Sequence, residues 1–268
     1  MPADDLAPRG TTVAVYAPSL TAMATARRHF PLRSVVIPTC SWSLFTSVVS
    51  GCDCAVVYSP APLPARRAAL ARLRMAAPFV PIVEIAPTNQ SAAVLPRLHL
   101  VGTPRDCESA GGLWALVQAA CTLALLERFA RMIEDSHAVS DALKDAITAL
   151  CERTPAIRTL AELAAVTGHN RRTLWQHWRR CGPSATLRLE DVADWMLALR
   201  AGVLHAERLT WTDAARRLGI DRHTVARIVR RHVGKPLAAV DAEDQARLRE
   251  GFLRTVIEPL IEARQPGV

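Results

Sequence analysis

The sequence predicts an α/β amino-terminal domain with a small parallel sheet, followed by an all-α carboxy-terminal domain. Three observations support this prediction. Short apolar runs alternate with helical segments over residues 11–110, residues 138–240 show helical periodicity without strand-like alternation, and 50% of the 268 residues are hydrophobic. That fraction is enough for two modest cores. Residues 1–10 are expected to be a flexible tail, 111–137 a connecting and dimerisation helix, and 241–268 a further helix with a tail.

Five apolar runs in the amino-terminal domain are predicted to be strands. A segment with helical character lies between most neighbouring runs, and helices between strands cover both faces of a parallel sheet. About 100 residues suit a small doubly wound domain of the flavodoxin-like type. The predicted strands are Thr12–Ala17, Ser34–Pro38, Ala55–Tyr58, Phe79–Ile85 and Leu98–Val101, and the predicted helices are Ser19–His29, Ser41–Ser50 and Pro64–Met75.

This order and length resemble a response-regulator receiver domain. The resemblance implies an acidic pair after the first strand, an aspartate after the third and a lysine after the fifth. The sequence instead has Tyr16–Pro18, Tyr58–Pro60 and Gly102–Pro104 there, and Asp53 precedes the third strand, at the opposite end of the sheet. Without clustered carboxylates nothing holds Mg²⁺ or accepts a phosphoryl group. We therefore expect a degenerate receiver-like domain that is not phosphorylated.

The sequence lacks motifs for catalysis or cofactor binding. It contains no G-x-G-x-x-G, phosphate-binding loop or G-x-S-x-G pattern. Cys40 follows the second predicted strand, as the cysteine of an amidotransferase-like domain does, but no histidine partner is evident and the domain is too short. Cys52 and Cys54 form one C-x-C without a second pair or a histidine at ligand spacing, which argues against zinc. We expect no enzymatic activity, no cofactor and no metal.

Cysteine usage and hydropathy predict a cytoplasmic protein. The seven cysteines have no paired spacing, and the first residues contain no apolar segment typical of a secretory signal. We expect reduced, mostly buried thiols. No run of 18 consecutive apolar residues occurs, so no membrane span is expected.

The segment Gly111–His137 is predicted to be one long helix with two apolar stripes. The first stripe suits packing on the sheet of the α/β domain, and the second extends beyond it. A helix with two stripes can pack on its own sheet and also on a second copy of the chain. Two interpretations therefore remain: a homodimer interface, or simply the last helix of the α/β domain. The stripes are Leu113, Leu116, Val117, Ala120 and Ala124, and then Leu125, Phe129, Met132 and Ile133.

The positive charge is concentrated in the carboxy-terminal domain. Cys151–Val240 contains 16 Lys and Arg against 8 Asp and Glu, and this surplus equals the net charge of +8 of the whole chain. Apart from Lys144 and Lys235 the basic residues are arginines, which suit bidentate contacts with phosphates and guanine edges. A basic domain of this kind predicts an acidic polymer such as double-stranded DNA as its partner. A solvated basic face without a partner is the alternative.

A first helix-turn-helix unit is predicted at Thr159–Arg180. An apolar helix ends at Gly168, which can adopt the left-handed conformation that a sharp turn requires. Asn170 is expected to cap the second helix. That helix turns Leu174, His177 and Trp178 inward and Arg171, Arg172, Trp175, Gln176 and Arg179 outward.

A second unit is predicted at Thr210–Val233, where the A-x-x-L-G-I-D-x-x-T-V pattern is a stronger local signal. Gly219 and Ile220 form the turn, and Asp221 is expected to cap the second helix. That helix turns Val225, Ile228 and Val229 inward and Arg222, His223, Ala226, Arg227 and Arg230 outward. Either pair alone is compatible with an ordinary core hairpin, but two pairs with basic outer faces favour DNA binding.

Two helix-turn-helix units joined by the helix Leu187–Leu204 resemble AraC-type (AraC/XylS) transcriptional regulators. The resemblance covers roughly Ala138–Val240 and includes the R-R-H-V-G-K-P run at Arg230–Pro236. The usual sensor domain of that family is a cupin-like β-barrel, which the amino-terminal domain does not resemble. The resemblance therefore implies nothing about which effector this protein binds. The resemblance implies base contacts by Arg172, Trp175 and Gln176 in the first unit and by Arg222, His223, Ala226 and Arg227 in the second.

Two functions follow as hypotheses. The first is a cytoplasmic transcriptional regulator that reads specific DNA, with transcription machinery as a further partner. The second is a protein-interaction adaptor that binds DNA only non-specifically. The amphipathic helix at Ala242–Ala263 serves either the DNA-binding domain or a partner, and the sequence does not decide between them.

Overall fold

The computed structural model describes residues 10–58, 63–86, 98–105, 111–152, 156–181 and 187–262. The chain divides into two compact units, Met1–Ala124 and Leu125–Val268, and each is described here by itself. The division falls inside the predicted connecting helix. Nearly all of the predicted amino-terminal tail, and the last six residues of the chain, lie outside the described residues.

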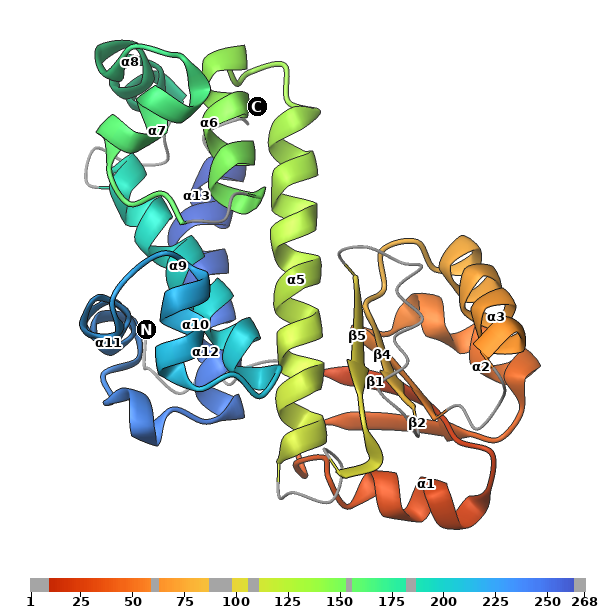
Figure 1. The fold of residues 1–268 in the computed structure, drawn as a ribbon. Helices are drawn as coiled ribbons and strands as arrows, with labels where there is room; N and C mark the ends of the chain where they lie inside the picture. The colour runs from red at the N-terminus through yellow and green to blue at the C-terminus, as the bar shows by residue number, and fades with distance from the viewer. Residues whose placement is uncertain are drawn as a thin grey trace, which may run out of the picture. The chain divides into compact units, whose positions relative to one another are not determined.

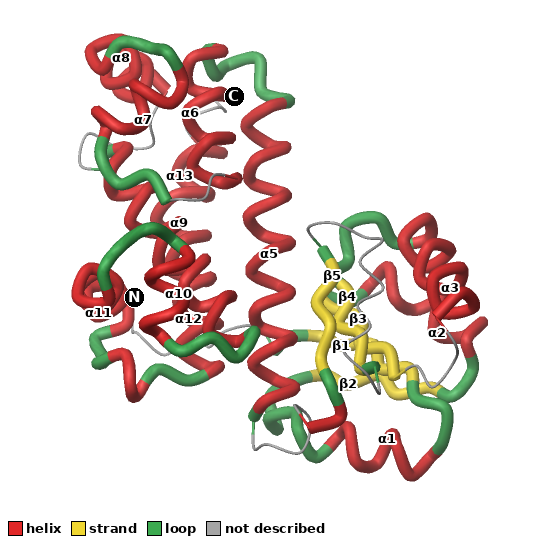
Figure 2. Tube along the Cα trace, viewed as in Figure 1, coloured by secondary structure: helices red, strands yellow, loops and turns green. Residues whose placement is uncertain are grey.

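The first unit contains a five-stranded parallel sheet with the strand order β2-β1-β3-β4-β5 (Figures 1 and 2). This is the order of flavodoxin-like sheets, so the predicted fold class is confirmed. The strands are β1 (Thr12–Tyr16), β2 (Val35–Thr39), β3 (Cys54–Tyr58), β4 (Ile82–Ile85) and β5 (His99–Gly102). All of β3 and β4 is buried except the last residue of β3, as expected for central parallel strands.

Three helices and the first half of α5 (Gly112–Glu134) accompany the sheet: α1 (Leu20–Arg27), α2 (Trp42–Val48) and α3 (Leu63–Ala76). Ser19 and Ser41 cap α1 and α2 by accepting backbone N–H groups, because each hydroxyl satisfies a donor that the first helical turn leaves free. A core between the sheet and α2 and α3 contains Phe45, Leu70 and Leu73 (Figure 1).

The predicted strand Phe79–Ile85 is too long, because β4 begins only at Ile82. The guanidinium of Arg74 donates to the carbonyl oxygens of Pro78, Val80 and Leu98, each at 3.0 Å, which holds the residues before β4 in a turn. Pro81 also lacks the N–H group that a central strand needs.

A buried charged cluster joins α3 to the sheet. Glu84 on β4 is fully buried, and its carboxylate lies 2.7 Å from Arg66 Nε and 3.1 Å from His99 Nε2. A buried carboxylate requires such partners, since desolvation is otherwise very unfavourable. The cluster therefore fixes α3 over β4 and β5.

The second unit is entirely helical among its described residues. One core runs through it and includes Phe129, Trp178, Trp195, Ile228 and Phe252. The amphipathic helix near the carboxy terminus packs into this core, which resolves the alternative that the sequence left open. The helices are the second half of α5, α6 (Asp141–Glu152), α7 (Leu160–Thr167), α8 (Arg171–Cys181), α9 (Leu189–Ala206), α10 (Trp211–Arg217), α11 (Arg222–Val233), α12 (Ala242–Phe252) and α13 (Glu258–Glu262), with a π-helical turn at Leu253–Ile257.

The helix α5 contributes to both units. Leu113 and Val117 are buried in the first unit, and Phe129 and Ile133 are buried in the core of the second. Of the second apolar stripe, on which the expected dimer seam rested, Phe129 and Ile133 are therefore covered by the chain itself, whereas Leu125 and Met132 are half-buried. By length and hydropathy α5 is the one described helix that would suffice to cross a membrane, and 67% of its most apolar window is buried inside the protein, as in a core helix.

Candidate nucleic-acid interface

The helices α10 and α11 form a pair with a sharp turn between them. Gly219 has φ +72°, a conformation that favours glycine, and it links the end of α10 to the cap of α11. Asp221 caps α11: its carboxylate accepts the backbone N–H of Thr224 at 2.8 Å and the hydroxyl of Thr224 at 2.6 Å. These contacts lower the pKa of the Asp221 carboxyl, because both stabilise the charged form. The predicted turn and cap are confirmed.

The two faces of α11 differ as predicted. Val225, Ile228 and Val229 are fully buried against α9 and α10. Ala226 departs from the expected outward position, because it is half-buried and packs against the core. The exposed side chains are Arg222, His223, Arg227 and Arg230.

The helices α7 and α8 form a second pair with the same local construction. Gly168 has φ +71° at the end of α7, and Asn170 Oδ1 accepts the backbone N–H of Arg172 at 2.8 Å. Trp178 is 4% exposed, and its indole N–H donates to the carbonyl oxygen of Leu187 at 2.7 Å, so this large residue fits the core with its polar atom satisfied. His177 is half-buried, and its Nδ1 is hydrogen-bonded to the hydroxyl of Ser140.

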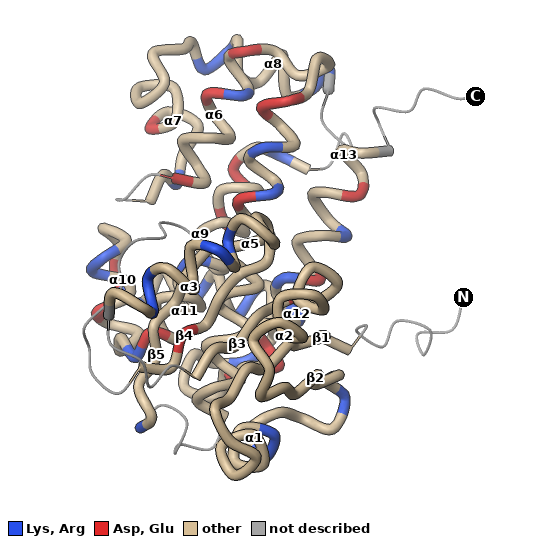
Figure 3. The backbone as a smooth tube through the Cα atoms, turned by 90° about the vertical axis from the view of Figure 1, so that its right-hand side faces the viewer, with Lys and Arg blue, Asp and Glu red and all other residues tan. Residues whose placement is uncertain are grey.

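The outer face of α8 carries an exposed aromatic residue among arginines. Trp175 is 50% exposed, and the guanidinium of Arg179 lies 5.1 Å from the centroid of its ring. This cation–π contact holds the two side chains against each other on the exposed face of α8. Arg171 and Arg172 are also exposed, whereas Gln176 is half-buried. Figure 3 marks the positions of the basic and acidic residues along the described backbone.

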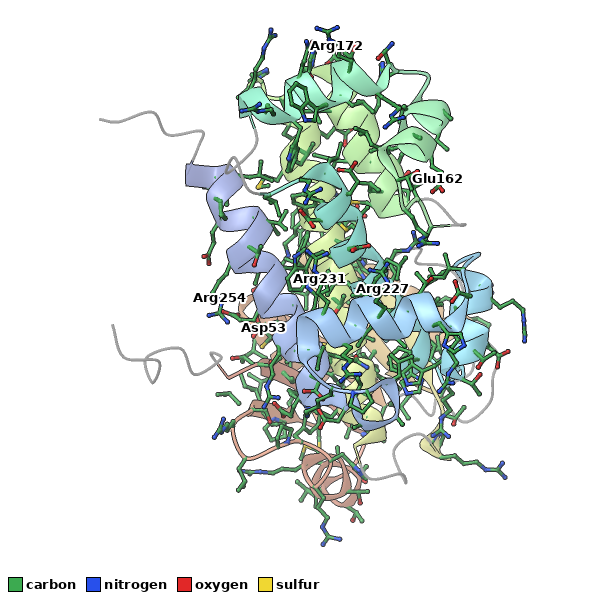
Figure 4. All side chains as sticks on the ribbon, turned by 90° about the vertical axis from the view of Figure 1, so that its left-hand side faces the viewer. Asp53, Glu162, Arg172, Arg227, Arg231 and Arg254 are labelled. Atoms are coloured by element: carbon green, nitrogen blue, oxygen red, sulfur yellow. The ribbon has the colours of Figure 1, made fainter. Side chains whose placement is uncertain are left out.

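The two helix pairs share one core, and α8 and α11 lie on the same side of the helical unit (Figure 1). Figure 1 shows α8 and α11 nearly end-on, and Figure 4 shows α11 lengthwise with Arg227 on it and Arg172 on α8. The backbone N–H of Ala156, just before α7, donates to the carbonyl oxygen of Leu218 at the end of α10, at 2.8 Å. Because this bond and the common core join the pairs, the spacing between α8 and α11 is fixed.

Aromatic stacking holds α10 and α11 on α9. The ring centroids of Trp195 and His232 are 3.8 Å apart, and those of His205 and Trp211 are 4.1 Å apart. Burial, together with the neighbouring charge of Arg231, lowers the pKa of His232 to about 4, so this ring is neutral at pH 7 and stacks without a charge to desolvate.

The sequence reasoning missed an ion-pair network between α9 and α11. Arg231 Nη2 lies 3.1 Å from Asp191 Oδ1, and Arg231 Nη1 lies 3.3 Å from Asp194 Oδ2. Burial raises the pKa of Asp194, while the charges of Arg227 and Arg231 oppose that rise. The three-residue spacing of the aspartates on one helix face was the available signal, but their partner lies 37 to 40 residues away in sequence.

Comparison with known families supports a helix-turn-helix assignment for the second pair. Residues 193–236 match the family model of a homeodomain-like domain, which covers most of α9 and all of α10 and α11. The chain thus contains a helix-turn-helix domain, a class that places its last helix in the major groove of DNA. A search of curated proteins with this chain finds no match.

Proposed function

We propose that the protein is a transcriptional regulator that binds specific double-stranded DNA through two helix-turn-helix units. The observation that carries the proposal is the placement of α8 and α11, two capped helices with exposed arginine faces, on one side of a single core. Helices held in this way can enter successive major grooves on one face of a duplex. The arrangement of two pairs around α9 is the one that the resemblance to AraC-type regulators implies.

The proposed contacts divide into base-reading and positioning groups. Arg172, Trp175 and Gln176 of α8, and Arg222, His223 and Arg227 of α11, are proposed to meet base edges, where arginine reads guanine and glutamine reads adenine. Ala226 is small and half-buried, so it is proposed to offer only a close apolar approach. Arg171, Arg179 and Arg230 are proposed to contact phosphates, which fixes the register on the duplex.

Selection from random duplex DNA at two salt concentrations tests the proposal. An enriched motif with two half-sites about 10 bp apart, retained at the higher salt, is the expected result. Arg172→Ala or Arg227→Ala is then expected to weaken binding to the selected duplex by about 1–3 kcal/mol and to relax specificity at one position. An equal loss on scrambled DNA would show that these side chains contact phosphate only.

The receiver-like unit is proposed to act in sensing or dimerisation without phosphorylation. Asp53 supports this: its carboxylate accepts the backbone N–H of Thr12 at 2.8 Å, at the amino ends of β1 and β3, where it serves the sheet. We further propose a cytoplasmic, non-enzymatic protein that contacts transcription machinery. A homodimer through Gly111–His137 stays a prediction, to be tested by the mass of the protein in solution.

A protein-interaction adaptor with non-specific DNA binding is the second candidate. Its support is that the sequence offers no recognisable ligand pocket and carries a further helical segment, α12–α13, after the second helix pair. That segment is mostly committed to the core, since Leu248, Val256 and Leu260 are buried in it. Selection that yields no motif, with binding that collapses at higher salt, would favour this candidate.

A further inference from the structure

A hollow of about 320 Å³ opens in the helical unit beside α11. Its lining comes from three places in the fold: the segment before α7, the first turn of α9 and the exposed side of α11. In Figure 4 the two labelled residues of α11 that line it, Arg227 and Arg231, lie on the side of that helix toward α8. The lining residues are Arg158, Arg188, Glu190, Asp191, Asp194, Arg227 and Arg231.

The charges in this hollow are layered. The side chain of Arg231 is 55% exposed, whereas those of Asp191 and Asp194, which hold it, are 22% and 17% exposed. The carboxylates therefore lie deeper than the guanidinium that they orient. An anion that approaches from solvent meets a positioned arginine first, and a positioned arginine loses little conformational entropy on binding.

Three further guanidinium groups line the hollow and form no direct ion pair among the described residues, although the charges of two of them, Arg158 and Arg227, act on Asp194. They belong to Arg158, which is half-buried, and to Arg188 and Arg227, which are exposed. Two of the three carboxylates of the lining are already engaged by Arg231. The four guanidinium groups of the lining outnumber its three carboxylates, so the hollow has a surplus of one positive charge, and guanidinium N–H groups are the donors that bind phosphate.

We propose that this hollow binds a backbone phosphate of double-stranded DNA, in the stretch of duplex between the segments that α8 and α11 contact. The inference rests on the proposed function, because it needs both helices on one duplex. Between two successive major grooves on one face, the duplex presents the phosphates that border its minor groove. Arg158 and Arg188, which neither helix carries, supply a contact that fixes position without reading sequence.

The test measures the dependence of DNA affinity on salt for the full chain and for Arg158→Gln/Arg188→Gln. The probes are the duplex enriched by selection and a scrambled duplex of equal length. Arg131→Gln/Arg254→Gln is the matched control, since it removes the same charge from two exposed arginines that form i,i+4 ion pairs elsewhere in the chain. Thermal unfolding of each variant shows whether it is folded.

The expected result is a decrease of about 0.9 in the slope of log K against log salt, because the proposal adds one phosphate contact and each such contact contributes about 0.9. Affinity is expected to fall by about tenfold or more and by the same factor on both duplexes, with the control unchanged. If the double variant does not fold, Arg188→Gln alone carries the same prediction with about half the change in slope.

An unchanged slope, or a loss confined to the selected duplex, would overturn the inference and leave the proposed function intact. A parent protein that selects no motif would instead overturn the proposed function. The two failures are therefore distinguishable in one series of measurements.

Discussion

Replacing Phe252 with alanine is expected to destabilise the helical unit by about 3–5 kcal/mol. The ring is fully buried, makes an edge-to-face contact with Phe129 at 5.3 Å between centroids, and lies 6.3 Å from the ring of Trp195. Burial of a phenylalanine side chain stabilises by about 1.5–3 kcal/mol, and an edge-to-face pair adds about 0.5–1.5 kcal/mol. The cavity left behind accounts for the rest, because the neighbouring rings relax only partly.

Thermal unfolding followed by circular dichroism measures this change. For a unit of this size each kcal/mol shifts the midpoint by about 2–4 °C, so a decrease of roughly 6–20 °C is expected. Ile261→Ala is the control on the same segment, since Ile261 is 42% exposed and its loss is expected to stay within about 0.5 kcal/mol. A decrease of less than about 3 °C for Phe252→Ala would refute the conclusion that α12 belongs to the core of this unit.

Two further predictions concern the same core. Gly251→Ala is expected to lower the free energy of unfolding by about 1–3 kcal/mol, although a Gly→Ala change in a helix usually raises it. The added Cβ would lie 2.6 Å from Cη2 of Trp195, and the Trp195 ring is held against His232. An unchanged midpoint of thermal unfolding would show that the indole can move. Since the pKa of His232 is about 4 in the folded chain and about 6.5 when unfolded, its contribution is fully present above pH 6.5 and is lost as the pH falls toward 4. After a discount for solvent screening, the stability lost between pH 7 and pH 5 is about 1 kcal/mol. His232→Phe keeps an aromatic ring at this position, so its free energy of unfolding is expected to depend less on pH over the same range.

Local features of the fold followed directly from the sequence. Ser19, Asn170 and Asp221 are caps because a short polar side chain beside a helix start has a backbone donor within reach, whatever the rest of the chain does. Gly168 and Gly219 mark turns for an equally local reason. The flavodoxin-like class of the sheet was also predictable, because a parallel sheet of five strands joined by helices has few possible strand orders.

Contacts between distant segments did not follow from the sequence. Nothing near Glu84 in a buried strand indicates that Arg66 and His99 would meet its carboxylate. The same holds for Arg231, which looked like one more exposed arginine of α11 but is tied to α9. Such pairs depend on how elements pack, and periodicity describes only one element at a time.

The hydrogen bond from Ala156 to Leu218, together with the common core, would limit the spacing between the two half-sites of a DNA sequence that this protein binds. One base pair inserted between two half-sites rotates one of them by about a tenth of a turn, given 10–10.5 bp per turn. A protein whose two reading helices swivelled freely would tolerate that change. In this chain the DNA would have to twist or bend instead, so binding sites are expected to vary in their bases far more readily than in their spacing.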